Sequence, residues 1–458
     1  MVKPNQPNSR IGRGYRVGRL GLSLAGSYLG YQLQNLLLGS DSREERRRTL
    51  HRRVSRRVRE ELESLKGPFM KLGQLLSTQS QALPDDVLEE LAKLQMKAPG
   101  MHPTLARAQF KASFGKYPEE AFTEFDPEPF AAASLGQVHC AVTKQGARVA
   151  VKIQYPAIRT AIENDFKLLK SAAIPGRVTG YFPVAILEEA QRGFLEETDY
   201  LNEGRNIDFL REQLARFQFL TIPNVHWDLT TDRVLTMSFL QGTTIRDFLA
   251  RKPSQAVRNL IGFRLLQIYQ YQLHFVHAIH ADPHPGNYLF QDDGSIGLVD
   301  FGCVKRLSPD IPELARALLE RAWLQGDRQV SRILRLIWGP GDYAKNPKAH
   351  RMLETITDFY NTVFPPPESN CPVVDFGSPR VLNSLTLNMQ KAVRHKLANA
   401  EFAFSTRAEL GLYNLLHQLA AKVDTADVLQ TLDLFGDSKH PDATTPATAR
   451  SKQRPAPV

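Results

Sequence analysis

Apolar positions recur with a helical period in much of the first hundred residues. Between residues 43 and 66 they return every three or four positions, with arginines between them, which predicts one amphipathic helix. A Gly-Pro pair ends this helix. We expect a second, short helix over 69–80 and a third over 86–95, with Asp85 as the N-terminal cap of the third.

The period of the apolar positions changes after Phe125. Short runs with strand-like composition lie near 137–143, 147–154 and 234–240. The segment LFQDDGSIGLV at 289–299 has turn residues at its centre and predicts a hairpin. Helical spacing covers the longer stretches, about 157–217, 245–279 and 308–430, the last one interrupted by a Pro-rich loop at 364–372.

The positive charge of the chain is concentrated at its beginning. Residues 1–60 contain 14 Lys and Arg against 4 Asp and Glu, which accounts for the whole formal net charge of +10. Such an arm indicates an anionic partner. We favour a membrane surface, where each basic side chain contributes about 1 kcal/mol. A solvated basic face is the plainer alternative, and nucleic acid is the weakest one because the arm lacks interleaved aromatic residues for stacking.

An apolar run at 20–30, LGLSLAGSYLG, is a candidate membrane segment. Its small residues have the spacing of close helix packing. The run continues into polar residues, however, and a spanning helix needs about 20 mostly apolar residues. We therefore expect an amphipathic helix on a membrane surface or on the protein's own body, and neither a transmembrane helix nor a secretory signal.

Cysteine and histidine spacing weighs against a disulfide framework and against a zinc site. The chain has three cysteines, far apart and without CxxC spacing, which fits a reducing, cytoplasmic compartment; they are Cys140, Cys303 and Cys371. Four histidines lie close together in sequence, at 274, 277, 280 and 284. Prolines at 283 and 285 break the helical geometry that a metal cluster would need there, and we expect His280 to be a packed loop anchor.

The segment HADPHPGN at 280–287 carries the clearest chemistry. An Asp followed five residues later by an Asn suits phosphoryl transfer, because Asp282 can approach the nucleophile and the Asn287 oxygen can ligate a metal. Asp300 of a DFG motif adds a second carboxylate for Mg²⁺. Upstream, Lys152 lies in a strand-like VAVK, and this order matches the protein-kinase signature set. A second DFG, at 375–377, has no catalytic loop before it, and we treat it as coincidental.

The segment AAASLGQVH at 131–139 lies where a phosphate loop should lie. Three alanines occupy positions that usually hold glycine, and each Cβ restricts the backbone angle φ. Gly136 alone keeps full conformational freedom. We predict a stiff loop that holds nucleotide in a pose poorly suited to transfer onto a protein.

These motifs together resemble the UbiB/AarF family of atypical kinase-like proteins, which are linked to ubiquinone and other isoprenoid lipids. The resemblance runs from about Lys71 to Val423 and implies an α+β, two-lobed kinase-like fold with an N-terminal helical KxGQ extension and a helical C-terminal lobe. It rests on KxGQ at 71–74, the alanine-rich loop at 131–139, VAVKIQYP at 149–156, ExD at 197–199, HADPHPGN at 280–287 and DFG at 300–302.

The resemblance implies a role for each matching position. Lys152, fixed by Glu203, would hold the α- and β-phosphates, and Asp282 would take the place of the catalytic base. Asn287 and Asp300 would bind Mg²⁺. Nucleotide would contact the backbone of the hinge at Phe239 and the loop residues Ala131, Ala132, Ala133, Ser134, Leu135, Gly136, Gln137 and Val138. The KxGQ segment would fold across the cleft, near the ExD residues, and close it against protein substrates. The regulatory residues are Lys71, Gly73, Gln74, Glu197 and Asp199.

Two positions depart from the family pattern. Ser238 in the hinge stands where the family often has glutamate, with little consequence expected because adenine contacts there are mostly made by the backbone. His277, just before the catalytic loop, stands where a glycine is usual, which puts the local loop geometry in question.

The sequence thus predicts an ATP-binding atypical kinase or ATPase that uses ATP or ADP with Mg²⁺ and supports ubiquinone or other isoprenoid-lipid metabolism at a membrane. Its expected partners are nucleotide, an isoprenoid lipid or quinone precursor, and an anionic membrane surface. The alternatives are a nucleotide-binding pseudokinase that acts as a lipid-binding or assembly factor and, less well supported, a nucleic-acid-binding ATPase. We divide the chain into a basic arm (1–42), a helical KxGQ extension (43–124), an N-lobe (125–240), a C-lobe (241–435) and a disordered tail (436–458).

Overall fold

The computed structural model describes residues 101–434, except for gaps at 134, 165, 168–183, 283, 344–345, 367–368, 370–372, 382 and 386–399. The basic arm, most of the KxGQ extension and the C-terminal tail lie outside the described residues. The expectations for those segments stay predictions.

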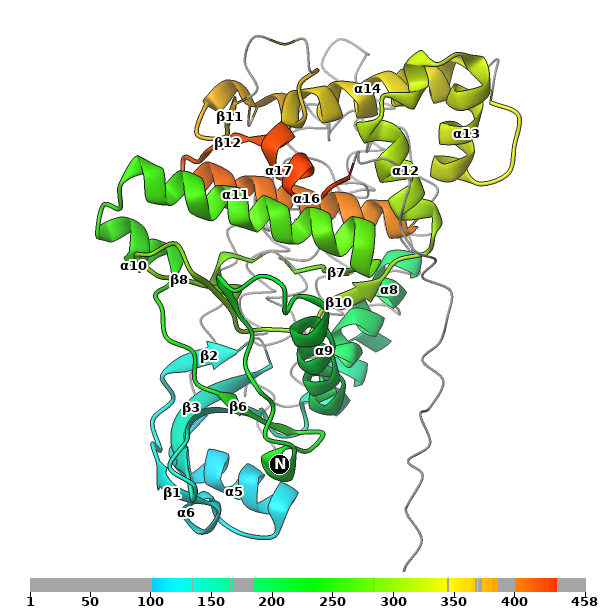
Figure 1. Ribbon diagram of the computed structural model, residues 1–458. Helices are drawn as coiled ribbons and strands as arrows, with labels where there is room; N and C mark the ends of the chain where they lie inside the picture. Colours follow the sequence, from blue (N-terminus) through cyan, green and yellow to red (C-terminus); the bar gives the residue numbers. More distant parts are fainter. Residues whose placement is uncertain are drawn as a thin grey trace, which may run out of the picture.

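A five-stranded antiparallel sheet forms the smaller lobe, at the bottom of Figure 1. Its strands are β1 (Phe122–Phe125), β2 (Ala131–Ala133), β3 (Gly136–Thr143), β4 (Arg148–Gln154) and β6 (Val234–Ser238), in the order β1-β3-β4-β6 with β2 also pairing with β3. Side chains alternate between the two faces of each strand. On β4, Val149 and Val151 pack on one face with Phe110, whereas Ala150 joins the core of the larger lobe on the other.

Two helices cover the outer face of this sheet, α5 (Pro103–Phe114) and α6 (Pro118–Ala121). Phe110 of α5 and Phe122 at the start of β1 are both buried in the same apolar cluster. The boundary expected at 125 therefore falls inside strand β1, and residues 101–124 belong with the smaller lobe, because their apolar side chains are buried against its sheet.

Two helices connect the lobes. They are α8 (Val184–Glu196) and α9 (Tyr200–Gln213). Both lie in the stretch for which the sequence predicts a long helical region. Asp199 caps α9, since its carboxylate accepts a hydrogen bond from the N–H of Asn202 at 3.0 Å. The short strand β5 (Leu220–Thr221) follows and pairs in parallel with β9 (Ile296–Leu298) of the larger lobe.

The larger lobe begins with α10 (Ile245–Ala250) and α11 (Gln255–Tyr271), which continues as a π-helical turn at Gln272–Val276. Short strands and a 3₁₀ turn follow: β7 (Ala278–His280), the turn Pro285–Asn287, β8 (Tyr288–Phe290), β9 (Ile296–Leu298) and β10 (Val304–Arg306). Strands β8 and β9 form the predicted hairpin, and Gly294 supplies the positive φ (82°) of its turn. Strand β10 pairs with β7, which places the DFG segment beside the catalytic loop.

Helices make up most of the remaining lobe, at the top of Figure 1. They are α12 (Asp310–Leu319), α13 (Asp327–Trp338), α14 (Pro347–Val363), α16 (Ala400–Gln418) and α17 (Thr425–Thr431), with a two-stranded sheet of β11 (Val373–Asp375) and β12 (Lys422–Asp424) and a 3₁₀ turn at Ala322–Leu324. The second DFG begins in β11, and its Phe376 is buried in the core of this lobe. Within the described residues, no helix has both the length and the apolar character needed to cross a membrane.

The backbone conformation of His277 accounts for the glycine that is usual at this position. Its backbone is left-handed, with φ 52° and ψ 33°, at the point where the π-helical turn passes into β7. Glycine adopts this conformation without strain, whereas a residue with a Cβ is disfavoured there. His277 therefore occupies a backbone conformation that favours glycine.

A glycine pair tests the packing of the smaller lobe. A Cβ on Gly136 would lie 2.3 Å from the carbonyl oxygen of Ile153, so Gly136→Ala should lower the free energy of unfolding by about 1–3 kcal/mol or more. Gly193 of α8 has no atom within 4 Å of the same point, and Gly193→Ala should raise stability by about 0.5–1 kcal/mol. Thermal unfolding of both variants measures the difference. Shifts of equal sign would contradict this packing.

Candidate functional site

The segment 131–138 forms a strand-turn-strand hairpin rather than an irregular loop. Residues 131–133 of β2 pair with 136–138 of β3, and none of them has a positive φ. Leu135 in the turn is buried, and its carbonyl accepts a hydrogen bond from the N–H of Tyr155 at 3.0 Å. Alanine is compatible with this segment because extended backbone accommodates a Cβ. Ser134 and the side chain of Ala132 lie outside the described residues.

Gly136 is required because it lacks a side chain, and not because its backbone needs conformational freedom. Its backbone is that of an ordinary strand residue, paired with Gln154 of β4. A Cβ there would collide with the Ile153 carbonyl and would lie 2.9 Å from the hydroxyl oxygen of Tyr200. The expectation that Gly136 is the free position of the loop is therefore wrong, since close approach of β4 and Tyr200 requires the glycine.

Alternate residues of β3 point to opposite faces of the sheet. Val138 lies opposite Lys152 and packs against the core of the larger lobe, so it faces the cleft. Gln137 is buried on the other face, where its side-chain oxygen accepts a hydrogen bond from the N–H of Met101 at 2.7 Å and its amide contacts His139. The Gln137 side chain is therefore not available to contact nucleotide, because its polar groups bond Met101 and His139 inside the smaller lobe.

Lys152 is the centre of a buried ion cluster. Its Nζ donates to both carboxylate oxygens of Glu203, at 2.8 and 2.9 Å, and lies 3.4 Å from Oδ2 of Asp300. The side chains of Lys152 and Glu203 are only 6% and 2% exposed. Burial alone would lower the pKa of Lys152, but the carboxylates of Asp300 and Glu203 outweigh it and raise the pKa well above the ordinary value. The lysine is therefore held as a cation between the two lobes.

The catalytic-loop motif brings Asp282 and Asn287 together. The side-chain amide of Asn287 donates to the Asp282 carbonyl at 2.9 Å and to its Oδ2 at 3.1 Å. The 3₁₀ turn Pro285–Asn287 positions the buried asparagine, with Pro285 at its first position. Both donor hydrogens thus point to Asp282, which leaves the amide oxygen as the group that can accept a cation.

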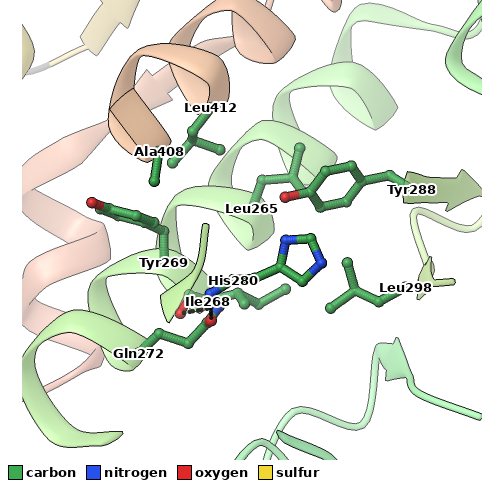
Figure 2. A pocket seen from close by; sticks show the side chains of 9 residues that line it. All are labelled: Leu265, Ile268, Tyr269, Gln272, His280, Tyr288, Leu298, Ala408 and Leu412. Atoms are coloured by element: carbon green, nitrogen blue, oxygen red, sulfur yellow. Dashed lines mark hydrogen bonds between the residues drawn. The ribbon is translucent and has the colours of Figure 1, made fainter. Parts of the chain in front are cut away.

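His280 anchors this loop to the DFG segment, as the sequence predicted. Its backbone N–H donates to Oε1 of Gln272 at 2.7 Å, and its Nε2 donates to the carbonyl of Asp300. The other ring nitrogen, Nδ1, has no hydrogen-bond partner among the described residues. Beside the histidine ring lies a cavity of about 20 Å³, shown in Figure 2, with residues of α11, α16 and the β8–β9 hairpin around it. This volume is enough for one water molecule.

The ExD residues lie at the junction of α9 and the DFG segment. Asp199 uses its carboxylate to cap α9, the helix that carries Glu203 in its first turn. The Cγ of Glu197 lies 3.5 Å from the point where a Cβ on Gly302 would be. Lys71, Gly73 and Gln74, the other residues assigned a regulatory role, lie outside the described residues.

The hinge follows β6. The N–H of Phe239 donates to the Arg148 carbonyl at 3.1 Å, and the Arg148 guanidinium lies 4.1 Å from the centre of the Phe239 ring. The N–H of Ser238 donates to the carbonyl of Asn224 at 2.9 Å. Phe239 therefore lies at the edge of the sheet, beside the strand that carries Lys152.

Two residues of α9 belong to the site and were not singled out from the sequence. The Lys152 ammonium lies 5.0 Å from the centre of the Tyr200 ring, and the side-chain amide of Asn206 donates to the carbonyl of Phe301 at 3.0 Å. Both are spaced three residues from Glu203, so all three lie near one side of the helix. This spacing is the signal that could have identified them.

Comparison with known proteins identifies the family of this chain. The model of the ABC1 atypical kinase-like domain matches residues 93–333, more than half of the chain. The chain belongs to this family. Among its relatives, AarF domain-containing protein kinase 1 of Mus musculus is 33% identical over 64% of the chain and 58% of its own length. Probable protein kinase UbiB of Marinobacter nauticus is 34% identical over 60% and 52%.

A third relative, Protein ACTIVITY OF BC1 COMPLEX KINASE 7, chloroplastic, of Arabidopsis thaliana, is 35% identical over 57% of the chain but only 38% of its own length. The chain thus spans about half the length of these curated relatives. A solved structure titled "The complex structure of Rv3197-erythromycin from Mycobacterium tuberculosis" superposes with a TM-score of 0.57, covering 85% of this chain and 98% of that one at 23% identity. This confirms the atypical kinase-like fold.

Removal of the central cation should destabilise this atypical kinase fold. Lys152→Ala leaves the buried Glu203 without its partner, and we expect a loss of about 3–5 kcal/mol near pH 7.5. Burial raises the pKa of Glu203. Below neutral pH the folded variant therefore takes up a proton that the unfolded chain does not yet bind, and the deficit should shrink toward pH 5.5.

Lys422→Ala is the matched control, because the Lys422–Asp375 pair is about half exposed on both sides and contributes about 0–1 kcal/mol. Thermal midpoints of both variants across this pH range measure the effect. A Lys152→Ala deficit as small as that of the control, or one that grows as the pH falls, would contradict the buried-pair assignment.

Proposed function

We propose that this chain binds Mg²⁺-ATP between its two lobes and acts as an atypical kinase or ATPase that supports ubiquinone or other isoprenoid-lipid metabolism at an anionic membrane surface. The observation that carries the proposal is the bidentate contact of Lys152 with Glu203 beside Asp300. A buried ion pair of this kind is poor evidence for stability, because burying two charges costs desolvation. It is well explained as a way to hold a flexible lysine in one position for phosphate oxygens.

The donor set near Lys152 fits Mg²⁺. Asp300 offers a carboxylate and Asn287 an amide oxygen, and hard oxygen ligands are what this ion requires. No cluster of three or more His, Cys, Asp or Glu that could hold a metal is present among the described residues. A site with two protein ligands suits Mg²⁺ at nucleotides, since substrate phosphates and water complete its octahedral shell. When bound there, Mg²⁺ would neutralise developing charge on the transferred phosphoryl group.

Asp282 is the proposed base. Its Oδ2 is held by the Asn287 amide at 3.1 Å, which fixes the carboxylate beside the metal ligand. In transfer, the acceptor oxygen forms a bond to the γ-phosphorus while the bond to the β–γ bridging oxygen breaks and ADP leaves. The proton of the acceptor hydroxyl or water passes to the carboxylate. Lys152 steadies the phosphates that remain on ADP.

The lipid and membrane part of the proposal rests on the names of relatives and on the positive charge of residues 1–60. Relatives in this family include one named UbiB. Residues 1–60 carry the entire net positive charge of the chain. An anionic membrane leaflet has the opposite charge and a surface large enough to contact many basic side chains.

A pseudokinase that binds nucleotide as an assembly factor is the second candidate. One observation favours it: the Lys152 ammonium contacts Asp300 and the Asn287 amide donates to Asp282, so these donors are already paired within the protein. Binding without turnover would then be the whole activity.

Nucleotide affinity tests the metal site. In the parent chain, Mg²⁺ should tighten ATP binding, measured by titration calorimetry. Asp300→Asn removes a carboxylate ligand, and the Mg²⁺-dependent gain should fall by about tenfold, which corresponds to about 1.4 kcal/mol. Asp375→Asn changes the same residue type in the second DFG, in strand β11, and should leave the gain unchanged. Equal effects of the two substitutions would exclude the proposed site.

Hydrolysis tests the membrane part and separates the two candidates. ATP turnover should rise with vesicles that contain phosphatidylglycerol but not with phosphatidylcholine alone, and the stimulation should weaken as salt is raised. A variant that lacks residues 1–60 should lose the stimulation. Tight Mg²⁺-ATP binding without turnover under any of these conditions would leave the pseudokinase as the function.

A further inference from the structure

Tyr200 carries a buried polar group that the fold does not use. It is the first residue of α9 and is 0% exposed, and its hydroxyl has no hydrogen-bond partner among the described residues. A buried hydroxyl without a partner is unfavourable by about 1–3 kcal/mol. Such groups are rare in folded proteins and call for an explanation, often in a ligand or a water molecule.

The position of this hydroxyl points to the phosphate region of the cleft. It lies 2.9 Å from the place of a Cβ on Gly136. Gly136 and Val138 are two residues apart in β3 and share one face, and Val138 pairs with Lys152 on that face. The Tyr200 ring also lies beneath the Lys152 ammonium, at 5.0 Å. The hydroxyl is therefore located between the alanine-rich hairpin and the lysine proposed to hold phosphate.

Neighbouring groups in the described residues do not occupy this hydroxyl. Lys152 directs its ammonium to Glu203 and Asp300. The Ile153 carbonyl, although close to Gly136, makes no hydrogen bond with Tyr200. Burial raises the pKa of Tyr200, so the phenol stays protonated and remains a donor at neutral pH.

We propose that the Tyr200 hydroxyl is a phosphate ligand, which donates a hydrogen bond to an oxygen of the nucleotide's phosphate chain beside Lys152. The inference rests on the proposed nucleotide function and adds a binding residue to it. Lys152 and Tyr200 are both buried, so nucleotide binding requires that both become accessible. The hydroxyl, which has no partner among the described residues, would gain a charged one on binding.

Tyr200→Phe removes only the hydroxyl and keeps the ring beneath Lys152. The matched control is Tyr155→Phe. The hydroxyl of Tyr155 is also buried without a partner among the described residues, but its side chain packs on the outer face of the sheet. Full-length parent and both variants are compared by thermal unfolding without nucleotide and by titration with Mg²⁺-ATP and with adenosine.

We expect Tyr200→Phe to leave the thermal midpoint of the free protein unchanged or higher, because an unsatisfied group is removed. Its affinity for Mg²⁺-ATP should fall by about 10- to 100-fold, the range for a hydrogen bond to a charged group. Affinity for adenosine should not change, and Tyr155→Phe should bind both ligands like the parent.

Three results would overturn the assignment. They are a lower midpoint for the free Tyr200→Phe protein, an unchanged Mg²⁺-ATP affinity in that variant, or an equal loss of ATP and adenosine binding. In each case parent binding of Mg²⁺-ATP would keep the proposed function in place. If the parent itself bound no Mg²⁺-ATP, the proposed function would fail, and the inference about Tyr200 would fail with it.

Discussion

The buried contact of Lys152 with Glu203 and Asp300 is the interaction on which the rest of this structure depends. It joins three separate segments, strand β4, helix α9 and the DFG segment, across the boundary between the lobes. Around it, Asp199 caps the helix that carries Glu203, Asn206 holds the Phe301 carbonyl, and His280 holds the Asp300 carbonyl. Each of these contacts fixes one partner of the cluster. Burial of the Lys152–Glu203 pair costs desolvation, which is consistent with a site built to position the lysine.

Residue order and spacing carry the family resemblance, and the resemblance implies the kinase-like fold that the family match confirms. The hairpin at 289–299, the lysine strand and the catalytic-loop anchor at His280 follow from local pattern, because turn residues and motif spacing are local properties of a chain. The pairing of Lys152 with Glu203, 51 positions apart, came from family resemblance and is present in the structure. Local pattern alone could not have paired them, since strand and helix meet only through tertiary packing.

The failures have the same physical origin. The local sequence predicts a flexible position at Gly136, but its glycine is required by a backbone from another strand and a side chain from α9, neither of which is visible in the local sequence. The loop motif predicts a nucleotide contact for Gln137, although the alternation of β3 turns its side chain to the opposite face. Tyr200 has only its three-residue spacing from Glu203 as a sequence signal. The burial of its hydroxyl, which the spacing does not show, is a property of the folded chain.

The central claim is that the Lys152 ammonium contacts the phosphates of bound ATP. The most direct test is labelling of the full-length protein with an acyl-phosphate derivative of ATP, which transfers its acyl group to a lysine beside the bound phosphates, followed by peptide mass spectrometry. The account predicts acylation of Lys152 and protection of that residue by excess Mg²⁺-ATP but not by adenosine. Labelling confined to other lysines, or labelling of Lys152 that ATP does not suppress, would contradict it.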